Sequence, residues 1–478
     1  MHIMKYGPGY SRRHFLNTMG AGFCAGVLRP LWDVIAEDGK IDRAYPEELL
    51  DIGAYTKGKI NVGDKLTADN VDLVKDLMDE VTYIQIKQQG RVCDIAPTQR
   101  DVYKLNPPRY LDASLAHNGQ AKFDEKGNVV TQDGKPWIGG IPWLNPTEAG
   151  QVIAAHNLSW GRYDVAQYCI DEFDMDADGN EQYHYNYWWC EVAGTCRITQ
   201  DPKPYMPTPL DKDGMGVLRY QSAVWDYPND VKGTSILNIW PYDATQYPDF
   251  FGYLPAFKRV RRFPTNQRFE PVIAGSTFYL TDAWMTGDPT LTWGNFKLVG
   301  RGPALLATNG DPARDDVGWN AVNENWRLER HGGKTGQKFW NSSFSLVPEV
   351  FVVELEPTGY PRAPYSKKRI WYDARTIAPI TMNSFDRRGQ VWKQWEAGFD
   401  NFEKNSGKVH NSDADRGKGG MWSWLYVHSH DIQSGRITSF QHTQRTSGGM
   451  TDKRDFGADG YEAYGQYTTE AAIRRLGT

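Results

Sequence analysis

An acidic run in the first half of the chain has the spacing of a calcium-binding loop. Asp174, Asp176 and Asp178 occupy alternate positions, and Gly179 follows where such loops turn sharply. The twelfth position, which should supply a bidentate acid, is Tyr185, so the coordination set is incomplete. A plain hairpin turn between two strands is the favoured interpretation, and calcium is the only cofactor that these residues suggest as an alternative.

Three histidines near the C-terminus have the placement of a second metal site. His428 and His430 are two residues apart in a strand-type segment, so alternation places both imidazoles on one face. His442, on the expected partner strand, would be the third ligand. A polar outer face of the sheet explains the same pattern, and without three defined ligands and an open position no zinc hydrolase is indicated.

A basic run has the chemistry to recognise an anion. Lys258, Arg259, Arg261 and Arg262 fall in one predicted strand, where alternation sends Arg259 and Arg261 to the same face. At the rim of a cavity these two guanidinium groups would bind the carboxylate, sulfate or phosphate head of an amphiphile, or an acidic partner. Salt bridges to neighbouring strands are the alternative.

Aromatic side chains are abundant, at 13% of the chain with 18 Trp and 26 Tyr. Many fall on consecutive predicted strands, where large rings can line an apolar pocket. Trp188 and Trp189 must face opposite sides of their strand. The candidate ligand-binding aromatic residues are Trp188, Trp240, Tyr242, Phe251 and Tyr253. Ordinary core packing explains the same residues as the alternative.

These residues are positioned by segments that are mostly of β type. Alternation predicts strands over residues 160–173, 182–192, 216–227, 233–242, 250–262, 350–357, 365–373, 377–386 and 390–398, and a hairpin over 421–444. Helices are expected over 66–81, 147–156 and 469–476, and long loops over 201–215, 302–336 and 401–420. Short turns between the strands favour one mainly β (α+β) domain, a large antiparallel sheet with a few covering helices.

Composition and charge exclude several functional classes. A chain of 478 residues with a net charge of −5 is not suited to broad binding of nucleic acid or of anionic membranes. After the N-terminal region, no segment stays apolar for the ~20 residues that a membrane-spanning helix needs. We therefore expect a protein with a real hydrophobic core and no nucleic-acid partner.

The N-terminus has the features of an export signal. Ser11-Arg12-Arg13-His14-Phe15-Leu16 resembles the twin-arginine motif, and a short apolar run follows it. Small residues before position 37 favour cleavage after Ala36, which leaves residues 37–478 as a single domain exported in the folded state. Gly20 to Ala25 fits a dinucleotide-binding fingerprint, but no strand precedes it. A disordered basic N-terminus is the alternative.

Four cysteines follow the expected cleavage site. They are Cys93, Cys169, Cys190 and Cys196. In an oxidising compartment an even set can pair, and Cys190 and Cys196, with Gly194 between them, are close enough to bridge a tight turn. Four buried thiols are the alternative.

Several short segments, taken in order, resemble one family of bacterial cell-envelope proteins. They are "ADNVDLVKDLMD", "WIGGIPWLNPTEAGQVIAAHN", "YLPAFKRVRRFPT", "WGNFKLVG", "VFVVELEP", "YSKKRIWYDARTIAP" and "FDRRGQVWKQW", within about residues 60–445. The family is the thirteen-twenty-nine domain-of-unknown-function family. The resemblance implies a fold similar to periplasmic and outer-membrane lipoprotein carriers: an antiparallel sheet rolled into an incomplete barrel, with helices at its open side and an apolar cavity inside. It implies no catalytic residues.

The resemblance and the aromatic strands together suggest a function. We expect a non-enzymatic periplasmic carrier of a hydrophobic or amphiphilic molecule such as a lipid, a sterol or a hydrocarbon. By analogy with the family, its partners would be an export permease or an outer-membrane protein, and it would work at or near the outer membrane. A secreted enzyme acting on polysaccharide or lipid, and a structural subunit of an envelope complex, are the alternatives.

The export signal can be tested directly. Replacing both Arg12 and Arg13 by Lys should stop export, because the twin-arginine pathway reads this pair. Cell fractionation should then find the unprocessed chain in the cytoplasm. Arg29→Lys, outside the pair, is the control and should be exported normally. Delivery of the double variant to the periplasm at the normal level would contradict the interpretation.

Overall fold

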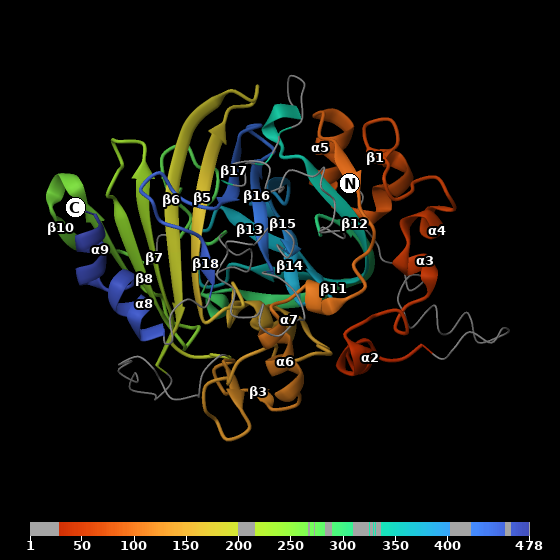
Figure 1. The fold of residues 1–478 in the computed structure, drawn as a ribbon, viewed down its shortest axis with the longest axis horizontal. Coiled ribbons are helices and arrows are strands. Elements are labelled where there is room, and N and C mark those ends of the chain that lie inside the picture. Colours follow the sequence, from red (N-terminus) through yellow and green to blue (C-terminus); the bar gives the residue numbers. More distant parts are fainter. Residues whose placement is uncertain are drawn as a thin grey trace.

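One large sheet organises the molecule. The computed structural model describes residues 28–198, 216–265, 268–271, 273–282, 289–308, 325, 328, 330, 336–401, 422–454 and 460–477. The main sheet has 16 strands in the order β1-β2-β12-β13-β14-β15-β16-β17-β5-β6-β7-β8-β9-β10, with β11 paired to β12 and β18 to β5. It curls without closing into a barrel (Figure 1). The expected fold, a mainly β incomplete barrel with a few covering helices, is confirmed.

The long strands form two antiparallel series. The first contains β5 (Val165–Met175), β6 (Glu181–Ala193), β7 (Val217–Tyr227), β8 (Ser235–Pro241), β9 (Asp249–Leu254) and β10 (Arg259–Phe263). The second contains β11 (Gly294–Leu306), β12 (Ser342–Glu356), β13 (Tyr365–Asp373), β14 (Ala378–Asp386), β15 (Val391–Asn401), β16 (Trp422–Asp431) and β17 (Ile437–Thr443). Pairing of β17 with β5 joins the two series and sets Ile437 opposite Met175.

Short strands complete the β structure. They are β1 (Lys65–Leu66), β2 (Cys93–Ile95) and β18 (Lys453–Arg454) in the main sheet, and β3 (Ala121–Phe123) and β4 (Val129–Thr131) in a separate hairpin. The pairing of β2 with β12 is parallel, whereas the long strands pair antiparallel as expected.

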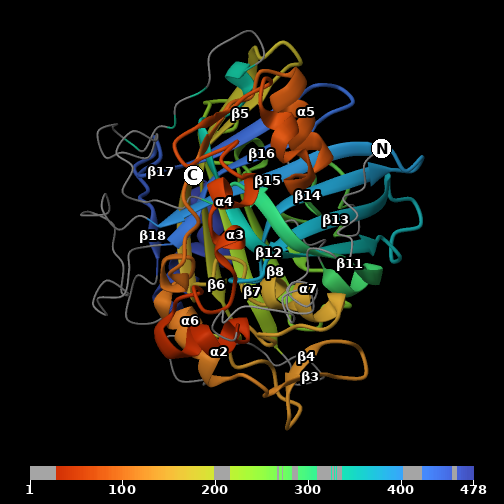
Figure 2. The same cartoon turned by 90° about the vertical axis from the view of Figure 1, so that its right-hand side faces the viewer.

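Helices cover the two sides of the sheet differently. α8 (Gly460–Tyr467) and α9 (Glu470–Leu476) pack on the outer side of the first series (Figure 1). α7 (Ala149–Asn157) contacts β11, β12 and β14 and lies near the opening between β8 and β11 (Figure 2). The remaining helices are α2 (Leu31–Asp38), α3 (Glu47–Leu50), α4 (Ile52–Thr56), α5 (Glu80–Gln88), α6 (Pro108–Ala116) and the 3-10 turns η2 (Val71–Leu77), η3 (Val102–Lys104), η4 (Pro255–Phe257), η5 (Thr290–Thr292) and η7 (Gly336–Lys338). Within the described ranges, no helix is long and apolar enough to span a bilayer.

Strands β5 to β8 bury both of their faces. On the outer, convex face, Cys169 and Trp188 pack with Ala463 of α8. On the inner, concave face, Ile170 lies opposite Tyr187, which in turn lies opposite Trp225, and all three belong to the main core. A strand that is buried on both sides is apolar along most of its length. Its sequence therefore does not reveal which face encloses a cavity.

The helix expected over 66–81 is wrong in its extent. η2 is kinked at Val74 (φ −127°), and the chain is extended at Met78 (ψ 161°). A new helix, α5, then begins, because the Asp79 carboxylate accepts hydrogen bonds from the backbone N–H groups of Val81 and Thr82. The N-cap residue inside the apolar pattern divides one expected helix into two short ones. The helices expected over 147–156 and 469–476 are confirmed as α7 and α9.

Two predictions in the middle of the chain are also corrected. The strand expected over 250–262 is a hairpin of β9 and β10, because Pro255 starts a tight turn that ends at Lys258 with a positive φ of 50°. The loop expected over 302–336 begins inside β11, whose glycines and bulges hide its strand pattern. The loops expected over 201–215 and 401–420 lie outside the described residues, apart from Asn401 at the end of β15.

The expected cleavage position lies within a helix that belongs to the core. The twin-arginine pair Arg12 and Arg13 is outside the described residues, but Ala36 lies in α2. Four side chains of this helix are buried in the main cluster: Leu31, Trp32, Val34 and Ile35. A chain that began after Ala36 would lack all four. In the part of the chain that the structure describes, this helix therefore packs as part of the domain core.

The contribution of α2 can be measured. Trp32 is only 3% exposed. Trp32→Ala should lower the free energy of unfolding by about 3–5 kcal/mol, because removal of the indole leaves a cavity. Urea unfolding of the purified protein measures this loss. Val62→Ala, at a 44% exposed position, is the control and should change stability by less than about 0.5 kcal/mol. An exported protein that is insensitive to Trp32→Ala would place the processing site downstream of this residue.

Candidate functional site

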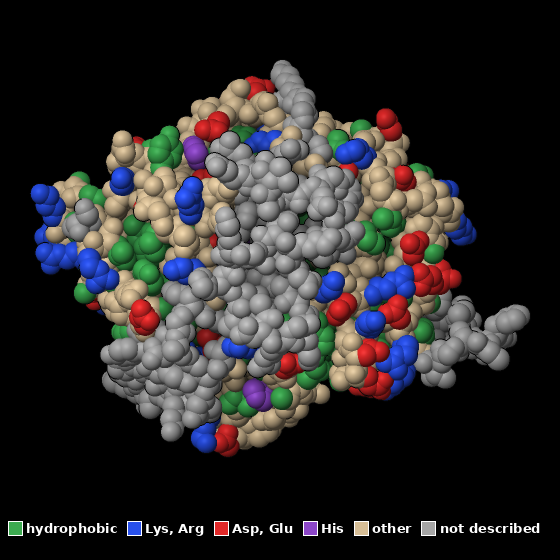
Figure 3. Space-filling view, viewed as in Figure 1, with side chains coloured by type: hydrophobic (Ala, Val, Ile, Leu, Met, Phe, Trp, Pro, Cys, Tyr) green, Lys and Arg blue, Asp and Glu red, His purple; other side chains and the backbone are tan. Residues whose placement is uncertain are grey.

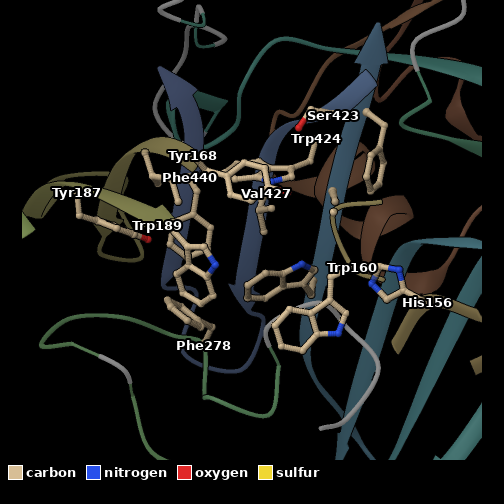
Figure 4. Close-up of a pocket in the computed structure, with 15 residues that line it drawn as sticks. His156, Trp160, Tyr168, Tyr187, Trp189, Phe278, Ser423, Trp424, Val427 and Phe440 are labelled. Carbon is tan, nitrogen blue, oxygen red and sulfur yellow. The ribbon is translucent and has the colours of Figure 1, made fainter. Parts of the chain in front are cut away.

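An apolar pocket lies on the concave face, where the two strand series meet. Its volume is about 80 Å³. Trp160, Trp189 and Phe278 converge around it, and His156 stands at one side (Figure 4). We call this the inner pocket; its lining is His156, Trp160, Gly161, Tyr168, Ile170, Tyr187, Trp189, Phe278, Trp395, Ala397, Phe399, Ser423, Trp424, Val427 and Phe440.

A crossing segment narrows the inner pocket. The backbone N–H of Thr277 donates to Thr438 Oγ1 (2.8 Å), and its hydroxyl donates to the carbonyl oxygen of Ser429 (2.5 Å). These bonds fasten the segment across β16 and β17. They set the ring of Phe278 against Trp395 and Phe440, at centroid distances of 5.5 and 5.0 Å. As a result the inner pocket is smaller than the ~300–1,000 Å³ of ordinary ligand sites.

A larger pocket opens beside the inner one. Its volume is about 390 Å³, which is within the usual range for a small-molecule site. The outer pocket is enclosed by α7, the β3–β4 hairpin, the end of β8 and the start of β11. Its lining is Phe123, Gly127, Asn128, Val129, Glu148, Ala149, Gly150, Ala154, Asn157, Leu158, Leu218, Trp240, Pro241, Tyr242, Ala244, Gln246, Pro289, Thr290, Leu291 and Phe296.

Two tryptophans stand between the pockets. Trp160 lines the inner pocket and Trp240 the outer one, and their rings meet edge to face with centroids 5.3 Å apart and an interplanar angle of 76°. The Arg219 guanidinium lies 3.7 Å from the Trp160 centroid, and that of Arg268 lies 5.1 Å from the Trp240 centroid. Such cation–π contacts hold both rings in place. Trp160 and Trp240 therefore meet where the two cavities adjoin.

Two buried carboxyl groups lie beyond the inner end of the inner pocket. Glu172 and Asp174 share the concave face of β5 with Ile170, and each is only 1% exposed. Burial raises the pKa of Glu172 well above its usual range, and the neighbouring Asp174 charge raises it further. Burial also raises the pKa of Asp174 to about 7, despite a hydrogen bond from the Thr438 hydroxyl. A proton is therefore retained in this pair near neutral pH.

The predicted ligand-binding aromatics divide between the two faces. Trp240 and Tyr242 line the outer pocket, where the Tyr242 hydroxyl donates to the Val129 carbonyl oxygen (2.6 Å). Trp188 is on the convex face and meets Tyr467 of α8 edge to face. The prediction that Trp188 lines the cavity is wrong, and its neighbour Trp189 takes that place.

Phe251 and Tyr253 also face away from the cavity. Phe251 lies opposite Leu237, and Tyr253 lies opposite Ser235, whose hydroxyl donates to a carbonyl of α9. These cross-strand partners place both rings on the convex side of β9. Their prediction as cavity residues is wrong because this side of β9 packs against α9.

The predicted arginines are at the edge of the sheet rather than at a pocket rim. β10 is an edge strand, and Arg259 and Arg261 are exposed on it. They share the concave face as expected, since Arg261 lies opposite Gly252, but neither lines the inner or the outer pocket. Arg261 stacks over Phe257 at 4.4 Å, and Arg262 pairs with Asp249.

The acidic run forms a hairpin turn between β5 and β6. Asp176 Oδ1 accepts hydrogen bonds from the backbone N–H groups of Asp178 and Asn180, both at 2.9 Å, which closes the β5–β6 turn. Asp174 instead points to Thr438 across the sheet. Within the described part of the chain, no group of three or more His, Cys, Asp or Glu side chains is arranged to hold a metal ion.

The histidines do not converge either. His428 and His430 share one face, as predicted, but α5 and the segment before β12 cover that face. The backbone N–H of Trp340 donates to His428 Nε2 (3.1 Å), and Gln85 Nε2 lies 3.0 Å from His430 Nδ1. Burial lowers the pKa of His428 to about 4. His442 faces the opposite side, between the rings of Tyr168 and Trp424. A three-histidine site is therefore wrong.

The predicted Cys190–Cys196 bridge is absent. Both thiols are free and buried, as are those of Cys93 and Cys169. Cys190 packs on the convex face, whereas Cys196 follows the end of β6 and packs with Trp137 and Tyr242. The two side chains lie on opposite sides of the sheet, which prevents bonding across the turn.

Sequence reasoning missed the residues that shape the inner pocket. Trp160 precedes β5 in an irregular segment, and Phe278 belongs to a crossing segment without strand or helix pattern. Glu172 is one of three acids in β5, with Asp171 and Asp174. Alternation places Glu172 and Asp174 on one face of the strand, but it does not tell that this face is the buried, concave one.

The carboxyl pair makes stability depend on pH. The pKa of Asp174 rises from an ordinary 3.8 to about 7 in the folded protein, so its favourable contribution is complete below about pH 4 and is lost as the pH rises to about 7. Asp174→Asn should reduce this dependence, and the raised pKa of Glu172 accounts for what remains. The free energy of unfolding, measured with urea, should fall between pH 5 and pH 8 in both proteins. The fall should be larger in the wild-type protein by on the order of 2 kcal/mol.

Asp176→Asn is the matched control for this measurement. Hydrogen bonds from Asn180 lower the pKa of Asp176 below its usual value, so its contribution is already complete at pH 5. This variant should differ from the wild-type protein in free energy of unfolding by the same small amount at both pH values. If the free energy of unfolding of Asp174→Asn falls with pH as steeply as that of the wild-type protein, the assignment is wrong.

Comparisons with known proteins agree with the sequence resemblance. The model of the family described as "Protein of unknown function (DUF1329)" matches residues 65–474. No curated protein matches the chain. Three solved structures are similar over about two thirds of the chain: an outer membrane lipoprotein-sorting protein domain from Vibrio parahaemolyticus, a DUF1329 protein from Desulfovibrio piger and a LolA superfamily protein from Nitrosomonas europaea.

Sequence identities to these three are 18%, 14% and 13%, with TM-scores of 0.37, 0.40 and 0.33. The matches cover 66%, 67% and 66% of this chain and 93%, 95% and 98% of the others. The family match, in contrast, extends from β1 to α9. The chain therefore belongs to the DUF1329 family.

Proposed function

We propose that this protein is a non-enzymatic carrier of an apolar or amphiphilic small molecule in the periplasm. The outer pocket is the observation that carries the proposal. It has about 390 Å³ of space, and its walls combine the rings of Phe123, Trp240 and Phe296 with backbone and a few polar side chains. This mixture of a mostly apolar wall and few polar groups is typical of small-molecule sites.

The two pockets together provide room for an elongated ligand. A molecule that fills the outer pocket and reaches past Trp160 and Trp240 would enter the inner pocket with its leading end. Burying about 400 Å² of apolar ligand surface would contribute roughly 10 kcal/mol before the costs of association. Association costs of about 4–15 kcal/mol are subtracted from this figure, so binding is reversible, as a carrier requires.

Partner recognition is assigned to a different surface. Lys and Arg side chains gather at the free edge of the first strand series (Figure 3), where Lys258, Arg259 and Arg261 are exposed on and next to β10. This edge also presents the unpaired backbone of β10. We assign it to an acidic face of the export permease or outer-membrane protein that delivers or receives the ligand.

Loss of the Trp240 ring should weaken ligand binding. Trp240→Ala removes one wall of the outer pocket and should reduce the affinity for a fluorescent apolar probe by about 1–3 kcal/mol, or roughly 5–150-fold. Titration of the folded protein with the probe measures the change. Urea unfolding of the same sample checks that the domain remains folded.

Trp188→Phe is the matched control, because Trp188 is on the same sheet but faces α8. It should lower stability and leave probe affinity unchanged. Equal weakening by both variants would show that probe binding reports general loosening of the domain. A wild-type protein that binds no apolar probe saturably would overturn the carrier function itself.

A further inference from the structure

Glu172 does not itself line the inner pocket, but it is next to three residues that do. On β5 it lies two residues from Ile170, on the same concave face, and directly opposite Phe440 of β17. Ile170 and Phe440 both line the inner pocket. Tyr187, a third lining residue, forms a hydrogen bond with the Glu172 carboxyl group.

One oxygen of this carboxyl group has no partner. Glu172 is 1% exposed, and its Oε1 atom has no hydrogen-bonding partner. Leaving a buried polar atom unpaired costs about 1–3 kcal/mol. Its neighbour Asp174 accepts from the Thr438 hydroxyl and lies near Arg436, although its Oδ2 atom is also unpartnered among the described residues. No cation of the described residues is among the causes that shift the pKa of Glu172, which are burial, Asp174 and Tyr187.

The surroundings keep this carboxyl group neutral. Burial and the Asp174 charge both favour the protonated form of Glu172. A neutral carboxyl group can donate one hydrogen bond and accept others, so it pairs with a hydroxyl or with a carbonyl group. An entering carboxylate, in contrast, would meet Asp174 and would be desolvated without a compensating cation.

We propose that Glu172 recognises a single uncharged hydroxyl or carbonyl group at the leading end of the apolar molecule that the protein carries. This inference rests on the proposed carrier function and specifies its ligand class. With a volume of about 80 Å³, the inner pocket accepts only such an end, while the apolar body occupies the outer pocket. The ligand would therefore enter with its polar end first.

The orientation differs from the one that the arginines suggested. Arg259 and Arg261 are at the exposed sheet edge and line neither pocket. These two residues therefore cannot bind the anionic head of a ligand at the rim of either pocket. The polar group is instead matched deep inside, at the unpartnered oxygen of Glu172.

A series of compounds with the same chain tests this ligand class. Displacement of a bound apolar probe is measured with dodecane, 1-dodecanol, 2-dodecanone, dodecanoate and dodecylamine. In the wild-type protein, the alcohol and the ketone should bind about tenfold more tightly than dodecane, because each supplies the missing hydrogen bond. Dodecanoate should bind more weakly than the alcohol.

Two substitutions at Glu172 separate recognition from packing. Glu172→Leu should abolish the roughly tenfold preference for the alcohol and ketone while keeping the affinity for dodecane. It should also raise the urea midpoint, since an unpaired polar group is replaced by an apolar one. Glu172→Gln, which keeps a donor and an acceptor, should retain the preference. Asp176→Asn, at the β5–β6 turn outside the pocket, is the control and should behave as wild type.

The outcomes distinguish this inference from the proposed function. If wild-type protein binds dodecane and dodecanol equally, or if Glu172→Leu keeps the preference, the role of Glu172 is wrong and the carrier function stands. A preference for dodecylamine above the alcohol would show an ionised Glu172 and overturn the uncharged ligand class. If no member of the series binds to wild-type protein, the carrier function itself fails.

Discussion

The pairing of β17 with β5 is the interaction on which the rest of the structure depends. It joins two strand series that are far apart in the sequence, with His442 opposite Ile170 and Phe440 opposite Glu172. Without this pairing, the aromatic rings of β6 and those of β15 and β16 would belong to separate sheets. With it, they face one interior, and the inner pocket lies along the line where the two series meet. A pairing between segments so distant in sequence is slow to form and expensive in chain entropy, so the large apolar area on both sides of the seam has to offset that cost.

Coverage of the convex face determines which side chains are left for the cavity. α8 and α9 use Trp188, Cys190 and Tyr220 as their packing surface, which removes these side chains from any role inside. The concave face is covered less completely: α7 and the segment around Phe278 fill part of it, and two cavities remain between them. The pockets are thus what remains when a curled sheet with large aromatic side chains is covered by few and short helices.

The sequence was sufficient for the fold class and for most of the strands, because alternation and short turns are local properties. It was insufficient wherever a choice depended on what packs against an element. Trp188 and Trp189 have the same residue type and are adjacent, and only the position of α8 decides that Trp188 is covered and Trp189 faces the pocket. The Cys190–Cys196 pairing failed for the same reason, since closeness in sequence does not give the side of the sheet. The helix over 66–81 failed on one N-cap, Asp79, whose carboxylate restarts the helix. Phe278 lacked any periodic pattern and was found only through its contacts.

Buried polar groups lie on both faces of the sheet. Beneath α5, Arg91 forms an ion pair with Glu396 and a hydrogen bond with Gln85, and the Asp79 carboxylate accepts from backbone N–H groups and from Gln394. These contacts fix the position of α5 on the sheet, although Arg91 Nε and His430 Nε2 have no hydrogen-bonding partner among the described residues. On the concave face, Glu172 Oε1 and Asp174 Oδ2 likewise have none within the described part of the chain. Burial of such atoms without a hydrogen-bonding partner lowers the stability of the domain. This stability is regained when a ligand supplies the missing hydrogen bond. A ligand with a polar end at that position should therefore bind more tightly than one with an apolar end.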